Sequence, residues 1–494
     1  MDKVDFCQLG HSGQYEFIRL YDWLRAFGDR AELVAVTDSV IANNYAGEIG
    51  TPGMFHHLGF PVANRYVWGI YGSWFVILNR IMLSFVWYGF QAWVGGECLY
   101  VCLHSIFPDI ETRIPNTVAS EFGTTAKLVC YIIFNIISLP LIWIHPHRLN
   151  KLLMLTSGLT VAFFVTIFIW ALATMSPAGL SFPPPVRVQS TGWTMVQGSI
   201  STLGAISAGI LNNNDYTRFS RSPRDAFFGQ VFSSPPAYVF CSMTGILVTA
   251  ATQHRFPGVP PVWNLPQLLV LLQDNAPTGS TRAIMFFAGA ALVASQLGIN
   301  VGGNAMSGGF DISALWPSFI TIRRGAYITA LLSPVVNPWR LVNTATVFIT
   351  VMSSYSVFLG PMVGLMVTGY YMIHRRKLKV ADLYVRDARS IYWYAGGIDW
   401  RTPIAWTCGV VPHIPGFIGA VTKDKGMAIE LTQLYQISFL SGFAIAAVVY
   451  WCLHWAFPDV RVQKWVAEAE EDGAFVGLEE PNKGSDSGKM EAVV

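Results

Sequence analysis

Charged residues are scarce in this sequence. Only 13% of the 494 residues are Asp, Glu, Lys or Arg, which is about half the share of a soluble globular protein. The charges also nearly cancel, because 32 Lys and Arg against 30 Asp and Glu leave a formal net charge of +2. A chain with so small a net charge has no basic field that would attract polyanions. We therefore expect no nucleic-acid partner and no disordered, highly charged chain.

Metal-binding and catalytic motifs are also missing from the sequence. The seven cysteines show neither the paired spacing of a disulfide framework nor that of a zinc site. Cys98 and Cys102 lie four residues apart, which suits helix packing better than metal binding. No phosphate loop of the Gly-Lys-Ser/Thr kind, no His-Glu-x-x-His and no Gly-x-Ser-x-Gly element occurs. The sequence thus predicts no metal, no cofactor and no enzyme.

Long apolar runs, by contrast, fill most of the chain. Hydrophobic residues make up 52% of it and aromatic residues 14%. A helix crosses the hydrocarbon core of a bilayer in about 20 apolar residues, and these runs do not alternate in polarity as barrel strands do. They predict an all-α polytopic membrane protein embedded in the lipid bilayer, with about ten helices in this chain. The predicted spans are 68–104, 128–144, 152–175, 193–211, 226–251, 283–305, 325–339, 344–373, 402–422 and 431–455.

Positive charge marks every second connection between these spans. Lys and Arg close to the ends of spans prefer the cytoplasm, and all the basic connections fall on one face if all ten spans cross the bilayer. The C-terminus is then cytoplasmic. The basic connections carry Arg148 and Lys151; Arg218, Arg221 and Arg224; Arg323 and Arg324; and the run 375–379.

The chain divides into three parts by composition. Residues 1–43 form an atypical polar N-terminal segment, and 44–459 form a transmembrane transporter domain. Residues 460–494 are acidic and contain Gly and Ser, which predicts a disordered cytoplasmic tail.

Polar side chains inside apolar spans are costly and therefore mark candidate functional sites. Trp87 and Gln91 lie four residues apart and share one helix face. An indole ring stacks on a flat heterocycle, and a carboxamide offers both a donor and an acceptor. The pair suits a pyrimidine or purine ring, and the alternative is an interfacial Trp with a helix-packing Gln.

Asn300 and Asn304 form a second such pair on one helix face. Gly302 and Gly303 between them allow close approach of another helix or local unwinding. An Asn carboxamide can bond the edge of a base through both of its polar atoms. The alternative is a hydrogen bond between two helices.

Two carboxyl groups and one polar segment remain open to two interpretations each. Asp311 lies two turns past Asn304, near Arg323 and Arg324. It either forms a gating ion pair or is simply a charge at the end of a helix. Glu97 either carries the coupling proton or forms a hydrogen bond to a neighbouring helix. The segment 212–218 is a broken helix of the kind that builds transporter sites, or a polar cap at the end of a helix.

At these residues the sequence resembles the nucleobase–cation symporter family, in its fungal uracil, uridine and allantoin permease branch. The resemblance covers about 44–459. The motifs that carry it are GFPVANR at 59–65, WYGFQ at 87–91, NDYTRF at 214–219, NVGGN at 300–304, DISAL at 311–315, IRRG at 322–325, YSVFL at 355–359 and YAGGIDW at 394–400.

The resemblance implies an inverted-repeat transporter fold of five plus five helices and two extra, working by alternating access. It implies that Trp87 stacks on the substrate ring and that Gln91 and Asn304 hydrogen-bond it. Asp311 resembles the family's acidic residue at the cytoplasmic side of helix 8. The family's first transmembrane helix is expected to precede Asn44. It has no apolar counterpart in 1–43, so the chain is expected to lack it.

The coupling ion is expected to be a proton. Counting back from Asn304, the two hydroxyl positions of the family's sodium site fall on Gly298 and Ile299. Neither side chain offers the oxygen that a hard cation seeks. A proton needs only a carboxyl group that holds it in an apolar site, and Asp311 and Glu97 are the candidates for gating or coupling.

The sequence therefore predicts a plasma-membrane secondary transporter, a proton symporter that takes up a uracil-like nucleobase, allantoin or a related ring compound. A thiamine or nucleoside carrier of the same family is the first alternative. A truncated member that does not transport is the second.

Overall fold

The structure is a computed structural model that describes residues 49–471, apart from 119–122, 145, 175–190, 257, 260, 261, 263, 342–344 and 423–425. The described residues are almost entirely helical, with one isolated bridge between Ala395 and Ile398. The helices are α3 Phe60–Ala63, α4 Arg65–Trp68, α5 Ser73–Ile106, α6 Ile110–Arg113, α7 Thr125–Ile142, α8 Pro146–Thr174, α9 Thr191–Leu211, α10 Asn214–Thr217, α11 Pro223–Arg255, α12 Leu265–Asn275, α13 Gly279–Ile299, η3 Asn300–Ala305, α14 Met306–Leu315, α15 Ile322–Leu332, η4 Ser333–Val336, α16 Pro338–Leu341, α17 Ala345–Thr368, η5 Gly369–Ile373, η6 Val380–Tyr384, η7 Ile391–Trp393, α18 Arg401–Val410, η8 Val411–His413, α19 Ile414–Thr422, α20 Ile429–Gln436, α21 Ser438–Ala456 and α22 Val460–Glu471.

Seven of the described helices are long and apolar enough to cross a membrane, which confirms the predicted fold class. Each contains or overlaps one of the predicted spans. They are Ser73–Ile106, Thr125–Ile142, Leu153–Thr174, Gly279–Leu315, Ser354–Ile373, Arg401–Thr422 and Ser438–Ala456.

The other three predicted spans have different outcomes. The spans 193–211 and 226–251 lie within α9 and α11, which are both continuous helices. The span 325–339 is wrong, because α15 stops at Leu332 and a 3₁₀ turn follows. Pro334 and Pro338 explain the interruption, since a proline lacks the amide hydrogen and clashes with the preceding turn of a helix.

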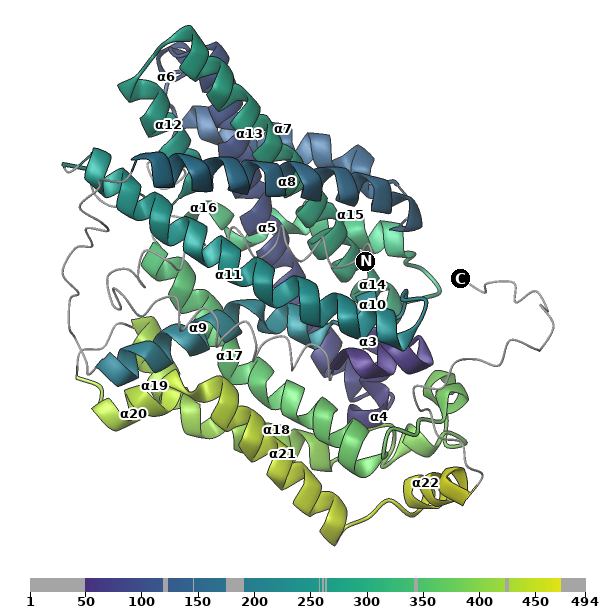
Figure 1. Cartoon of the computed structure of the whole chain (residues 1–494). Helices are drawn as coiled ribbons and strands as arrows, with labels where there is room; N and C mark the ends of the chain where they lie inside the picture. The colour runs from purple at the N-terminus through teal and green to yellow at the C-terminus, as the bar shows by residue number, and fades with distance from the viewer. Residues whose placement is uncertain are drawn as a thin grey trace.

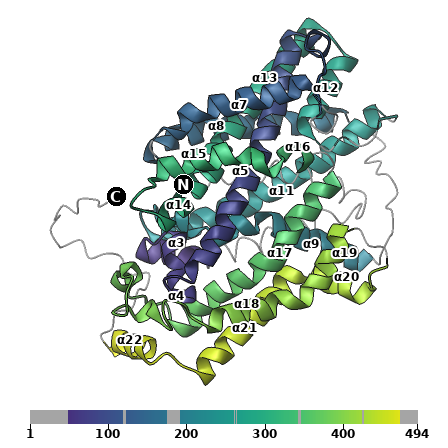
Figure 2. The same ribbon diagram turned by 180° about the vertical axis from the view of Figure 1, so that it is seen from behind.

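The helices form two groups joined through the middle of the molecule (Figure 1). α5 runs through the first group, where it packs against α7, α13 and α14. α17 runs through the second group and packs against α9, α18 and α21. Seen from behind, α5 crosses the first group obliquely, with α17 below it (Figure 2). α5 and α13 are therefore long neighbouring helices whose middle turns lie deep in the protein.

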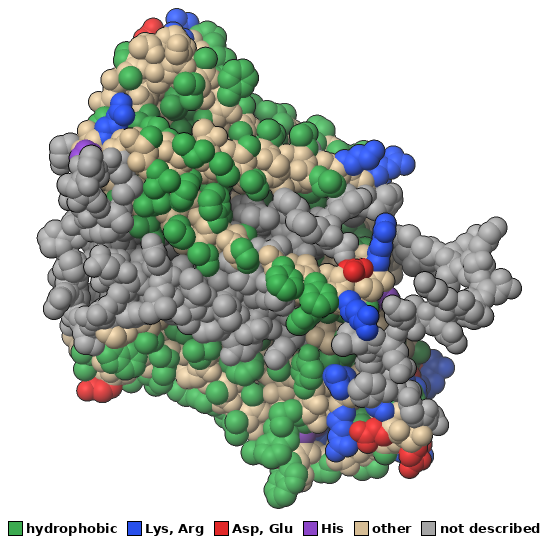
Figure 3. Space-filling model, viewed as in Figure 1, with side chains coloured by type: hydrophobic (Ala, Val, Ile, Leu, Met, Phe, Trp, Pro, Cys, Tyr) green, Lys and Arg blue, Asp and Glu red, His purple; other side chains and the backbone are tan. Residues whose placement is uncertain are grey.

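The surface fits a protein surrounded by lipid. Large apolar side chains are exposed along α7, α8 and α11, among them Ile136, Leu155 and Phe232. In the view of Figure 3, most Lys and Arg side chains gather along one edge, the end that carries α22 in Figure 1. We call this edge the basic end.

The predicted disorder of the tail is wrong for its first twelve residues. Val460–Glu471 form α22, which buries Val462, Val466 and Ala469. These three residues recur at helical spacing and so form one apolar stripe. Residues 472–494 of the predicted tail lie outside the described residues, as do residues 1–48.

Candidate substrate site

The helix that contains Asn300 and Asn304 changes its winding at these residues. α13 ends at Ile299, and Asn300–Ala305 form a π-helical turn before α14 resumes the α-helix. Gly302 and Gly303 sit inside this turn, where they lower the helix propensity. Single π-helical turns occur often at functional sites. The local unwinding that the glycines predicted is therefore present.

The two asparagines hold one another and the backbone of α5. The side-chain nitrogen of Asn304 donates to Asn300 Oδ1 at 3.0 Å and lies 3.4 Å from the carbonyl oxygen of Trp87. The side-chain nitrogen of Asn300 lies 3.3 Å from the carbonyl oxygen of Tyr88. Both side chains are buried. The structure thus brings the two predicted pairs together, because the asparagines reach the α5 turn that carries Trp87 and Gln91.

Trp87 and Gln91 occupy the buried middle of α5. Trp87 meets Phe90 edge to face, with ring centroids 5.9 Å apart. Gln91 is fully buried. Between them, a Cβ atom on Gly89 would lie 2.9 Å from the carbonyl oxygen of Ser333 in η4. The missing side chain lets η4 approach α5 at the level of the site.

Asp311 forms a buried ion pair, but not with the arginines nearest in sequence. Its Oδ2 lies 3.4 Å from Nε of Arg80 on α5, and both side chains are almost completely buried. Arg80 also donates to the carbonyl oxygen of Ala208 at 2.9 Å and to the hydroxyl of Ser307. The guanidinium lies 5.2 Å from the centre of the Phe60 ring. This pair joins α5, α9 and α14, two turns beyond Asn304 toward the basic end.

The segment that follows α9 is buried rather than an exposed cap. α9 ends at Leu211 and α10 begins at Asn214. Asn214 Oδ1 accepts from the backbone nitrogen of Gly53 at 2.9 Å, and Asp215 Oδ1 accepts from that of Phe60 at 3.0 Å. The segment is therefore a broken helix whose polar side chains bind the chain around residues 50–60.

Glu97 lies apart from the other predicted site residues. Its Oε1 is 3.3 Å from Nζ of Lys127, and its Oε2 accepts from the Asn264 side chain at 2.6 Å. Ten residues separate it from Trp87, which is about 15 Å along a helix. In this structure Glu97 connects α5 to α7 and to the start of α12, as the hydrogen-bonding alternative expected.

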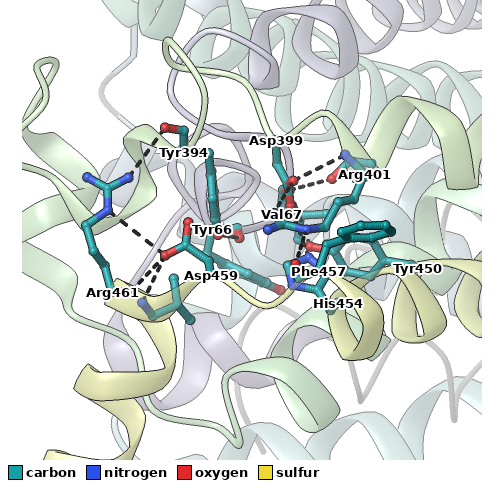
Figure 4. A network of polar contacts seen from close by, with 12 residues as sticks. Tyr66, Val67, Tyr394, Asp399, Arg401, Tyr450, His454, Phe457, Asp459 and Arg461 are labelled. Atoms are coloured by element: carbon teal, nitrogen blue, oxygen red, sulfur yellow. Dashed lines mark hydrogen bonds and ion pairs between the residues drawn. The ribbon is translucent and has the colours of Figure 1, made fainter.

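A second cluster of buried charges lies at the basic end, close to the start of α22 (Figure 4). Asp399 Oδ1 accepts from Arg401 at 2.8 Å, and Asp399 Oδ2 lies 3.1 Å from Nε2 of His454. The backbone nitrogen of Asp399 donates to the carbonyl oxygen of Trp68 at 3.0 Å. Tyr394 donates to the carbonyl oxygen of Tyr66 at 2.7 Å. The cluster fixes α4 against α18 and α21.

Burial also sets the charge of a histidine beside this cluster. It lowers the pKa of His374 to about 4, so the imidazole is neutral near pH 7. The Nδ1 atom of His374 donates to the carbonyl oxygen of Gly369 at 2.8 Å. The turn that follows α17 is thereby closed without an additional charge.

No group of three or more His, Cys, Asp or Glu side chains that could hold a metal occurs in the described parts of the chain. Cys98 and Cys102 are buried free thiols in α5. Two polar residues were not among the predicted site residues. Arg80 was a charge inside an apolar run, which is itself a sign of function. Gln296 lies one turn before Asn300, and this spacing would have placed it on the same face.

Comparisons with known proteins show the family of the chain. Residues 31–442 match the profile of a family described as permeases for cytosine/purines, uracil, thiamine and allantoin. The chain belongs to this permease family. It is therefore a membrane transporter rather than an enzyme.

Two fungal relatives illustrate the range of similarity. A permease of Schizosaccharomyces pombe is 34% identical over 83% of this chain and 69% of its own length. The allantoin permease of Saccharomyces cerevisiae is 31% identical over 82% of this chain. The matched region spans 65% of the length of that allantoin permease.

The fold has a solved counterpart. The structure is similar to that of Mhp1, a nucleobase-cation-symport-1 family transporter, in a closed conformation with bromovinylhydantoin bound. The TM-score is 0.69 at 17% identity, with 94% of this chain and 93% of that chain covered. This likeness shows the shared inverted-repeat transporter fold.

Proposed function

We propose that this permease takes up a uracil-like nucleobase, allantoin or a related neutral ring compound across the plasma membrane, together with a proton. The observation that carries the proposal is the Asn300–Asn304 pair, held in a π-helical turn against the α5 turn of Trp87. An indole face and several carboxamides at one level of the bilayer suit a flat ring with alternating donors and acceptors.

A neutral ring fits this site better than the cationic ring of thiamine. The polar side chains predicted to bind the substrate on the π-helical turn and on the α5 turn that it contacts are Trp87, Gln91, Asn300 and Asn304, and all are uncharged. A buried cation requires a paired counter-charge. The nearest described carboxyl group along α14 is that of Asp311, which is already paired with Arg80.

The same helix bears on the coupling ion. Gly298 and Ile299, at the two positions where the family's sodium site has hydroxyl side chains, carry no side-chain oxygen. Because a hard cation seeks oxygen ligands, these residues support a proton rather than a sodium ion. Asp311 is the carboxyl group suited to carry it, since its one ion-pair contact, with Arg80, is 3.4 Å long, whereas Glu97 is held by both Lys127 and Asn264.

The charge distribution supports one orientation in the membrane. The basic end carries Arg375 and Lys377 and the helix α22. Because basic residues close to spans remain in the cytoplasm, this end faces the cytoplasm and the C-terminus lies inside the cell.

Uptake measurements test the proposal. The full chain is expressed in cells that lack their own carriers, and accumulation of radiolabelled uracil, allantoin, uridine and thiamine is followed in sodium-free buffer across a pH series. We expect uptake of a neutral ring compound that a protonophore abolishes. Uptake that requires sodium and ignores the protonophore would contradict the coupling.

The asparagine pair is tested in the same assay. Asn304→Asp keeps the size of the side chain but replaces two donors with a charge, which is costly in an apolar site. We expect uptake to be lost or the order of preference among pyrimidines and purines to change. An unchanged competition profile would show that Asn304 has only a structural role.

A further inference from the structure

Gln296 is a buried carboxamide that the fold does not use. Its side chain is fully buried in α13. Among the residues that the structure describes, none forms a hydrogen bond with its Nε2 or with its Oε1. Other buried carboxamides in the described chain, such as Asn300 and Gln273, have hydrogen-bond partners. An amide buried without partners destabilises the folded protein, so packing alone does not explain this residue.

The position of Gln296 along the helix links it to the substrate site. It precedes Asn300 by four residues and Asn304 by eight, so the three carboxamides form one stripe on α13. Gly289, seven residues before Gln296 and on the same face, packs against Val101 and Cys102 of α5. Asn300 reaches the backbone of Tyr88 on α5. The stripe therefore faces α5 along its whole length.

The two contacts with α5 also give the level of Gln296. Asn300 and Gly289 are eleven positions apart, and Gln296 lies four positions from Asn300 in the direction of Gly289. On the antiparallel helix α5, Asn300 lies opposite Tyr88 and Gly289 lies opposite Val101. Gln296 is therefore opposite a point about one-third of the way from Tyr88 to Val101, which is within one turn of Gln91. The residue thus lies beside the substrate site, on the side away from the basic end.

The length of the stripe sets the kind of ligand that can use all of it. Eight residues of helix from Gln296 to Asn304 span about 12 Å. Asn300 and Asn304 together cover one turn, which matches the size of a single heterocyclic ring. Gln296 lies one turn further, beyond the reach of that ring. A hydrogen-bonding group attached to the ring would reach it.

We propose that Gln296 is a specificity-determining residue that binds a polar substituent of the substrate. The substrate class is then a neutral ring carrying a hydrogen-bonding arm, such as a ureido group or a sugar, rather than the bare ring. The inference rests on the proposed function, because it adds a second contact to the same site. The arm would lie toward the end opposite the basic end, where a substrate arriving from outside would enter.

The test uses two matched pairs of ligands and two matched variants of the full chain. Hydantoin and allantoin differ by a ureido arm, and uracil and uridine differ by a sugar. Gln296→Leu removes the amide at similar size. Gln273→Leu is the control, because Gln273 is equally buried but bonds Ser105 and the carbonyl oxygen of His104. Inhibition constants and melting temperatures are measured for the wild type and both variants in detergent.

We expect the wild type to prefer the arm-bearing ligand in at least one pair. Gln296→Leu should reduce that preference about three- to tenfold, the effect of one lost hydrogen bond. Its melting temperature should equal or exceed that of the wild type. Gln273→Leu should melt earlier and keep the preference unchanged.

Three results would overturn the inference. One is a ratio of inhibition constants within a ligand pair that differs less than twofold between Gln296→Leu and the wild type. Another is a melting temperature of Gln296→Leu as low as that of Gln273→Leu, which would show that the amide supports the fold. The third is a wild type that binds none of the four ligands. It would contradict the proposed function as well, and it is recognisable because the unmodified protein already fails.

Discussion

Two buried carboxyl groups at the same end of the molecule are bound in opposite ways. Asp399 is held on both oxygens, by the backbone and guanidinium of Arg401 on one and by His454 on the other (Figure 4). Asp311 is equally buried, yet its contact with Arg80 is 3.4 Å long. No described residue forms a hydrogen bond of normal geometry to either of its oxygens.

The difference separates a fixed anchor from a group that can change partner. Removing either Asp399 or Arg401 leaves the other charge buried without compensation, so this pair is stable only as a whole. Asp311 gains little from its one long contact. A proton on Asp311 breaks this one contact, while Arg80 keeps its bonds to Ala208 and Ser307.

The largest effect is expected from Asp399→Asn. The substitution leaves the guanidinium of Arg401 buried without its counter-charge, and breaking such a pair costs about 3–5 kcal/mol in the free energy of unfolding. Thermal unfolding of the purified protein measures the change. Asp387→Asn is the control, because the pair of Asp387 and Arg389 is exposed. If Asp399→Asn unfolds at the wild-type temperature, the cluster is not an anchor.

A smaller loss of stability is expected from Asp311→Asn, together with a loss of uptake. The asparagine can still accept from Arg80, which also keeps its contacts with Ala208 and Ser307. We expect a change of about 1–2 kcal/mol in the free energy of unfolding, smaller than that expected at Asp399. Proton-dependent uptake should disappear while the protein reaches the membrane. Normal uptake by this variant would remove Asp311 from the coupling step.

The smallest effect is expected from an exposed ion pair at the same end. Arg375 donates to Glu470 of α22 at 3.1 Å, and both side chains are largely exposed to solvent. Exposed pairs contribute at most about 1 kcal/mol and are screened by salt. Arg375→Ala should therefore lower stability by about 0.5 kcal/mol or less, and the difference should vanish in high salt. A large loss that persists in salt would mean that the pair belongs with Asp399 rather than with the surface.

The spans and the pairing of site residues on each helix were predictable because they depend on local periodicity. Trp87 with Gln91 and Asn300 with Asn304 follow from four-residue spacing. The break after Leu332 was indicated by Pro334 and Pro338, although its effect on the predicted span was missed. The buried face of α22 was visible as Val462, Val466 and Ala469, but the acidic composition around it hid the stripe.

Partners distant in the sequence could not be predicted. Arg80 and Asp311 are separated by 231 positions, and only the packing of α5 against α14 brings them together. The same holds for Glu97, whose partners Lys127 and Asn264 lie on two other elements. Sequence spacing placed Asp311 near Arg323 and Arg324, and tertiary packing gave it a different arginine.

The central claim is that the turn of α5 around Trp87 binds the substrate ring. The most direct test measures binding of radiolabelled uracil and allantoin to wild type and Trp87→Ala. Trp74→Ala, at the partly exposed start of the same helix, serves as the control. Because stacking of a base on an aromatic side chain contributes about 1–3 kcal/mol, Trp87→Ala should weaken binding about fivefold to 150-fold. Trp74→Ala should bind as the wild type does. Equal affinity in all three proteins would contradict the assignment of the site.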